Sequence, residues 1–175
     1  MPKDFYRSRL DLPMNEKVLN FLSSLEDDLW IVEEDITGTQ AHDIMLYEQG
    51  ILAGEEIKKI LISLEKIRKK ITNHKLKLDH NFEDIHPFIE KLVIDDIGIE
   101  IGGKIHTGRS RNDQISVDLR LKIRDELNKT SEKLIELINV LFKRSEETIN
   151  AFMPLYTHLQ GGQLGVFAHY LNNYV

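Results

Sequence analysis

The feature that most constrains the fold is a run of regularly spaced apolar residues between Ile115 and Phe152. They recur at three- and four-residue steps: Ile115, Leu119, Ile123, Leu127, Leu134, Leu137, Ile138 and Leu141. The first of them also alternate with Val117 and Leu121, a pattern typical of a strand, but the continued spacing favours one helix of about 35 residues, roughly 50 Å long. Its apolar faces must be covered by other helices, and a chain of 175 residues has few other helices with which to cover them. We therefore expect a multi-helix bundle made by association.

Shorter helices are predicted on either side of this segment. One is marked by apolar residues on a single face: Ile57, Ile60, Leu61, Leu64, Ile67 and Ile71. Gly50 is expected to end an earlier helix that holds Leu29, Val32, Ile36, Ile44 and Met45. Residues 74–85 resemble a connecting loop, followed by a short helix from Phe88 to Ile97 with Pro87 near its first turn and by breaks at Gly98, Gly102 and Gly103.

The C-terminal part is predicted to be helical as well. Pro154 is expected to end the long helix, and another helix is expected to start after Gly161-Gly162 and to continue through Val166, Phe167, Leu171 and Tyr174. The fold class predicted is therefore mainly α. A small helical N-terminal domain (residues 1–111) would precede the first part of a long-helix bundle domain (residues 112–175).

Composition excludes several classes of function. The formal net charge is -6 and the pI about 5.7, which argues against a nucleic-acid binder. The absence of cysteine excludes disulfides and thiol chemistry, and the spacing of the histidines matches no metal site. No apolar run is long enough to cross a membrane. Met1 to Leu12 lack the apolar core of a signal peptide, so a cytoplasmic location is expected by default.

The segment from Gly103 to Gln114 is the strongest candidate for a binding site. Lys104, Arg109 and Arg111 lie close together in an otherwise acidic chain, which favours a small anionic ligand. Arginines can hold carboxylates through two parallel hydrogen bonds, and the small and polar residues between them offer further donors. The alternative is structural: Ser110, Asn112 or Asp113 would cap the following helix, and the arginines would be solvated.

Three other groups of residues allow both a functional and a structural interpretation. Glu83-Asp84-Ile85-His86 is either part of a site or the acidic start of a helix. Ser23-Ser24 is either a binding segment or local turn chemistry. His158 is either a proton-transfer group or a partly buried histidine with ordinary partners.

These segments, in this order, resemble the argininosuccinate lyase branch of the fumarase/aspartase superfamily. The matching segments are Phe21 to Ser24, Asp35 to His42, Glu83 to His86, Gly103 to Leu121 and Tyr156 to Gln160. The string His106-Thr107-Gly108-Arg109-Ser110-Arg111-Asn112-Asp113-Gln114 is the most specific of them. The resemblance extends over most of the chain.

The resemblance implies β-elimination of argininosuccinate to arginine and fumarate, without cofactor or metal. By position, Ser24, Asn112 and Thr157 would bind the substrate, with Arg111 nearby. His158 would take part in proton transfer, and Asp84, His86 and Gln160 would support the site, with Asp84 a partner for the basic end of the substrate. The resemblance also implies a homotetramer in which segments of three subunits form each active site.

The chain also departs from the family pattern. A third family signature, a mobile loop carrying a proton-transfer serine, has no counterpart in these residues. Leu155, Gly161-Gly162 and Leu164 replace residues usual in the second signature. Little activity is therefore expected of the 175 residues alone. Two alternatives remain open: another fumarate-producing lyase of the superfamily, or a non-catalytic remnant or structural relative.

Overall fold

The structure, a computed structural model, describes residues 15–175. Residues 1–14, which include the whole of the Met1 to Leu12 segment, lie outside the described part. The chain divides into two compact units after Lys122. The domain boundary expected after residue 111 stays a prediction.

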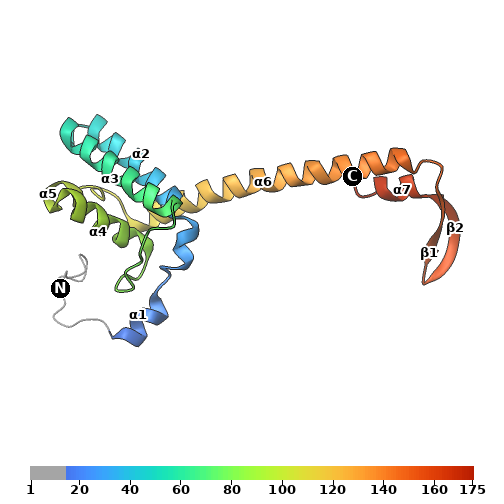
Figure 1. Ribbon diagram of the computed structural model, residues 1–175, viewed down its shortest axis with the longest axis horizontal. Coiled ribbons are helices and arrows are strands. Elements are labelled where there is room, and N and C mark those ends of the chain that lie inside the picture. The colour runs from blue at the N-terminus through green and yellow to red at the C-terminus, as the bar shows by residue number, and fades with distance from the viewer. Residues whose placement is uncertain (1–14) are drawn as a thin grey trace. The chain divides into compact units, whose positions relative to one another are not determined.

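The first unit is built from helices. In chain order these are α1 (Glu16–Leu22), the 3-10 helix η2 (Asp27–Trp30), α2 (Val32–Glu48), α3 (Gly54–Thr72), α4 (Ile85–Ile97), α5 (Ile99–Gly102) and the first turns of α6 (Arg111–Glu147). Figure 1 shows α2 and α3 side by side, with α4 next to them and α5 following α4. Residues 73–84 form the predicted connection between α3 and α4.

The core of this unit lies between α2, α3 and α4. The face of α3 predicted from its spacing supplies Ile57, Ile60, Leu64 and Ile67, all of which are buried. Phe88, Ile89 and Val93 of α4 pack into the same cluster. Complete burial of one such side chain contributes about 1.5–3 kcal/mol, so this interface is the main source of stability in the unit.

Helix α2 differs from its prediction in extent and orientation. Leu29 belongs to η2 rather than to α2, and Ile44 and Met45 remain 42% and 40% exposed. The reason is that Val32, Ile36 and Leu46 define the core-facing side of α2. At 100° per residue, Ile44 and Met45 point away from it. Gly50, at φ 72°, ends the helix as predicted.

Helix α6, which begins in the first unit and continues into the second, agrees with the prediction of one long helix: it has 37 residues, and the strand interpretation of its alternating start is wrong. It ends at Glu147, before the predicted stop at Pro154, which instead lies in strand β1 (Phe152–Thr157). Neither α6 nor any other helix in the described part of the chain is long and apolar enough to span a membrane.

A β-hairpin occupies the place where the last helix was predicted to start. Strand β1 pairs antiparallel with β2 (Gln160–Val166), and α7 (Phe167–Asn172) begins only at Phe167. Gly165 permits this pairing, because a Cβ there would lie 2.7 Å from Leu155 Cδ1. Ser145 of α6 holds α7 through hydrogen bonds to Ala168 O and Asn172 Oδ1.

Candidate active site

One face of α2 carries acidic and hydroxyl side chains into the interior of the first unit. Asp35, Thr39 and Asp43 follow each other at four-residue steps and are 1%, 3% and 0% exposed. They lie on the same side as the core residues Val32 and Ile36. Burying carboxylates is unfavourable unless they are paired or protonated, so this face requires partners from other elements.

His86 is the centre of the resulting network. Its Nε2 lies 3.1 Å from Asp118 Oδ2 of α6 and 3.9 Å from Asp35 Oδ1, and its Nδ1 lies 3.2 Å from Asp84 Oδ1. Ionised carboxylates only accept hydrogen bonds, so both ring nitrogens must donate. The geometry therefore defines a protonated imidazolium that joins α2, α4 and α6.

The pKa values agree with this assignment. Burial acts to lower the pKa of His86, but hydrogen bonds to Asp118 and Asp84 and the charge of Asp35 outweigh it and raise the pKa to about 9. Burial raises the pKa of Asp35 to about 6 despite the charge of His86. Among residues 15–175, two groups of His and Asp side chains come close enough together to suggest a metal, but both include His86. A protonated imidazole has no free lone pair for a metal.

Asp84 connects this buried network to Arg111. It is the N-cap of α4, where its Oδ1 accepts the backbone N–H of His86 at 3.0 Å. Its Oδ2 accepts a hydrogen bond from Arg111 Nη1. Burial acts to raise the pKa of Asp84, but the His86 hydrogen bond and the Arg111 charge outweigh it and lower the pKa. Asp84 is thus an ionised group that fixes Arg111 in the first turn of α6.

Ser24, between α1 and η2, contacts the residues just before α4. Its Oγ donates to Asp28 Oδ2 at 2.8 Å, and the same oxygen accepts the Ile85 N–H at 3.2 Å. The Ser24 N–H donates to Glu83 O at 2.8 Å. The structure thus brings Ser24 to the Glu83–His86 segment, 60 residues away in sequence, as one polar region.

Asn112 follows Arg111 and is exposed. Its backbone N–H donates to Ser110 Oγ at 3.3 Å, so Ser110 caps α6 as the structural interpretation of this segment predicts. This capping is compatible with a binding role, because it leaves the Asn112 side chain at the surface.

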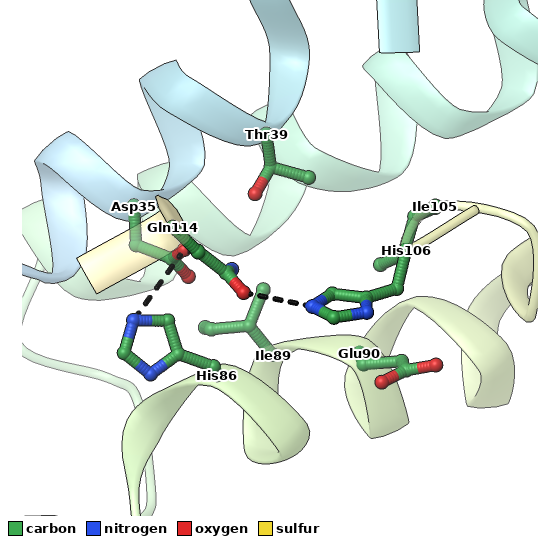
Figure 2. A pocket seen from close by; sticks show the side chains of 8 residues that line it. All are labelled: Asp35, Thr39, His86, Ile89, Glu90, Ile105, His106 and Gln114. Carbon is green, nitrogen blue, oxygen red and sulfur yellow. Dashed lines mark hydrogen bonds and ion pairs between the residues drawn. The ribbon is translucent and has the colours of Figure 1, made fainter. Parts of the chain in front are cut away.

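A small polar pocket lies between α2, α4 and the start of α6. Figure 2 shows its lining of Asp35, Thr39, His86, Ile89, Glu90, Ile105, His106 and Gln114. Gln114 Nε2 donates to Asp35 Oδ1 at 2.6 Å, and Gln114 Oε1 lies 3.0 Å from His106 Nε2. Burial lowers the pKa of His106 and raises that of Glu90, because it disfavours the charged form of each group. The pocket therefore continues the network beyond His86.

The remaining predicted site residues lie in the second unit. Thr157 ends β1, Gln160 begins β2, and His158 occupies the turn between them; all three are exposed. His158 and Leu159 have φ of 49° and 62°, which together with the pairing of Thr157 and Gln160 defines a type I′ turn. The turn displays His158 at the tip of the hairpin.

Several members of the network were not proposed as site residues from the sequence. They are Asp28, Asp35, Thr39, Asp43, His106, Gln114 and Asp118. Asp35, Thr39 and Asp43 do leave a signal, because they fall on the apolar face of α2 at helical spacing. A polar residue at a predicted core position indicates a buried polar partner from another element.

Comparison with known proteins places the chain in a family. A family model described as "Lyase" matches residues 9–175, and the chain therefore belongs to this lyase family. Within it, the chain matches the N-terminal portion of argininosuccinate lyases, which confirms the resemblance predicted from the motifs. It is 45% identical over 166 residues to the argininosuccinate lyase of Nitrosopumilus maritimus, a match covering 95% of this chain and 33% of the relative.

The argininosuccinate lyase of Heliobacterium mobile is 43% identical over 175 residues, a match covering 100% of this chain and 38% of that relative. A solved structure of an EDDS lyase variant with bound fumarate matches with a TM-score of 0.72 and 27% identity, covering 91% of this chain and 31% of that one. The chain thus spans about a third of the length of these proteins. The mainly α fold class, of the fumarase/aspartase type, is confirmed.

Proposed function

We propose that the chain contributes the N-terminal part of an argininosuccinate lyase, which splits argininosuccinate into arginine and fumarate. The observation that carries the proposal is the 43% identity to an argininosuccinate lyase across all 175 residues. The placement of Arg111 by half-buried Asp84 and buried His86, beside exposed Asn112, supports it. Ser24, Asn112, Thr157 and Arg111 are proposed to bind the substrate.

The proposed chemistry explains why such residues are required. A base removes the proton from the carbon next to a carboxylate, the C–N bond breaks, and the electron pair forms the double bond of fumarate. Negative charge that builds up on the carboxylate is stabilised by fixed donors and positive charge, for which Arg111 and Asn112 are suited. The departing guanidino nitrogen takes a proton from a general acid, and no cofactor or metal takes part.

Supporting roles follow from the contacts. Both oxygens of Asp84 are engaged, one by His86 and the other by Arg111. In the proposed enzyme Asp84 therefore orients Arg111, and its charge is also available to the basic end of the substrate. Gln160, opposite Thr157 in the hairpin, supports the turn that carries His158.

The test is a chimera, because the chain covers only part of its relatives. The 175 residues would be joined to the part of the Heliobacterium mobile enzyme that follows the matched region. Fumarate formation from argininosuccinate, followed by ultraviolet absorbance, is expected in the chimera, and little is expected from the 175 residues alone. An assembled chimera without turnover would contradict the proposal and favour a non-catalytic relative.

Within the chimera, His158→Asn is expected to lower turnover about 100-fold, because it removes a proton-transfer group. His169→Asn is the matched control: His169 is also exposed in the second unit, on α7. Equal turnover in the two variants would remove His158 from the proposed proton transfer.

The structural match to EDDS lyase favours a second candidate, another fumarate-producing C–N lyase. A panel of N-substituted aspartates would separate the two. Turnover confined to argininosuccinate supports the first candidate, and a preference for another amine supports the second.

A further inference from the structure

Arg109 and Arg111 lie two residues apart but face different surroundings. Arg111 meets Asp84 at the start of α4, whereas Arg109 Nη1 donates to Thr39 Oγ1 of α2 at 3.1 Å. Thr39 is only 3% exposed, so Arg109 reaches into the interior of the first unit. The sequence predicts that both arginines can hold a carboxylate ligand, but Arg109 differs from Arg111 in its surroundings.

The interior around Arg109 is acidic. A Cβ built on Gly38 would lie 3.4 Å from Arg109 Nη2 and 3.2 Å from Asp118 Oδ1. The Arg109 guanidinium and the Asp118 carboxylate therefore both approach Gly38, which has no side chain in the way. Asp118 Oδ1 and both oxygens of Asp43 are buried and accept no hydrogen bond from the described residues. Arg109 is thus close to buried carboxylate oxygens that have no hydrogen-bond donor among the described residues.

Electrostatics links Arg109 to the same groups. Burial raises the pKa of Asp43 to about 8, and the charge of Arg109 is the effect that opposes it. The charge of Arg109 also lowers the pKa of Asp35, against burial. A dicarboxylate ligand at Arg109 would have to enter near Asp35, which carries a negative charge above pH 6, and this is unfavourable.

Arg109 is the second-last residue of the segment 103–110, which we call the signature loop. Two further bonds tie this loop to the helices: Lys104 Nζ donates to Glu56 Oε1, and His42 Nε2 lies 2.9 Å from Thr107 O. Gly108 turns the backbone at φ 67° between Thr107 and Arg109. Arg109 is the attachment nearest to Arg111 and Asn112.

We propose that Arg109 is a positioning residue: its bond to buried Thr39, among the carboxylates of α2 and α6, fixes the end of the signature loop and thereby places Arg111 and Asn112. Arg109 does not touch substrate. This inference rests on the proposed function for the roles of Arg111 and Asn112, but the placement of the loop can be measured without turnover.

Amide hydrogen exchange of the 175-residue chain tests the placement. In Arg109→Met, exchange of the Thr107 and Gln114 amides, which donate to Lys104 O and Ser110 O, is expected to rise about tenfold relative to the α3 amides in the same sample. Arg68→Met is the matched control, because Arg68 also donates to a threonine hydroxyl of α2, that of Thr37, but lies outside the signature loop.

A second variant covers the case in which Arg109→Met does not fold. Thr39→Val removes only the acceptor, keeps the shape of the side chain and leaves every charge in place. It is expected to speed exchange in the signature loop in the same way. Unchanged exchange in the signature loop of Thr39→Val would overturn the proposal. Faster exchange spread evenly over α2, α3 and α4 would also overturn it, because that pattern indicates a general loss of stability.

The chimera adds a functional readout. Arg109→Met is expected to lower kcat/KM, and Arg68→Met to leave it unchanged. Normal kcat/KM in Arg109→Met would overturn the link to Arg111 and Asn112. An inactive chimera would count against the proposed function, whereas the exchange experiment would still decide whether Arg109 holds the loop.

Discussion

His86 shows how a single residue couples the stability of the first unit to pH. Its pKa is raised from 6.5 to about 9, so the folded state holds the proton more tightly than the unfolded chain. The resulting stabilisation is complete below pH 6.5 and disappears as the pH rises through 9. Asp43, with a pKa raised to about 8, contributes a change of the same sign as it loses its proton.

We therefore expect the free energy of unfolding of the first unit to fall as the pH rises from 6.5 to 9, by an amount on the order of 2–3 kcal/mol for His86. Denaturant unfolding at a series of pH values would measure it. His86→Asn should flatten the profile, with loss of stability at neutral pH because the aspartates lose their cation. His80→Asn is the control, since His80 is exposed. A rising or level profile in the unmodified chain would contradict the imidazolium assignment.

At the residue scale the sequence is only partly informative. Spacing and residue type singled out Arg111, Asp84 and His86, which the structure does bring together. They gave no sign that Arg109 reaches inward, because both arginines occupy the same short polar segment. The difference arises from Gly38 and Thr39, which lie about 70 residues earlier and meet Arg109 only in the folded unit.

At the scale of elements, the hairpin turn holds two residues in a conformation that L-amino acids rarely adopt. His158 and Leu159 both have positive φ, and the Leu159 side chain is 99% exposed, so packing does not compensate for the strain. Type I′ turns favour Asn-Gly at these positions. Strain of this kind is found where a functional group must be displayed, and His158 is the proposed proton-transfer group.

Leu159→Gly is therefore expected to stabilise the hairpin by about 1 kcal/mol, because glycine adopts positive φ without strain and no buried contact is lost. Leu164→Gly is the matched control: Leu164 is a similarly exposed leucine within β2, where glycine should weaken the strand. Backbone chemical shifts of β1 and β2 would report the hairpin population. A less populated hairpin in Leu159→Gly would show that the turn is not strained.

The elements with strong periodicity were predictable and the hairpin was not. The apolar stripe of α3 and the long repeat of α6 determine helices whatever their partners. Around the hairpin, Pro154 and Gly161-Gly162 predict the end of one helix and the start of another. The His158-Leu159 pair lacks the glycine that usually marks a two-residue turn, and the Leu155–Gly165 contact is visible only once the strands pair.

At the scale of the whole molecule, apolar surface on α6 is the feature that calls for association. Beyond Lys122 the helix exposes a series of large side chains: Ile123, Leu127, Leu134, Ile135, Leu137, Val140 and Phe142. Burying one such side chain contributes about 1.5–3 kcal/mol, so several together provide a strong drive for helix packing. The homotetramer implied by the resemblance stays a prediction.

We expect the 175-residue chain to self-associate in a concentration-dependent manner, and the double substitution of Leu127→Gln and Leu134→Gln to reduce the associated fraction. Sedimentation equilibrium would measure both. Lys133→Gln is the control, because it changes an exposed polar residue of the same helix. Association that is insensitive to the double substitution would place the contact surface elsewhere.

The apolar cluster formed by Leu25 to Ile105 is closed before α6 begins. During synthesis, the residues that enclose it leave the ribosome ahead of the second half of the long helix. The early part of the chain is thus able to bury its apolar cluster while later residues are still being added. The second half of α6 has to wait for a neighbouring helix, and during that interval it is the natural target for a chaperone that recognises exposed leucine.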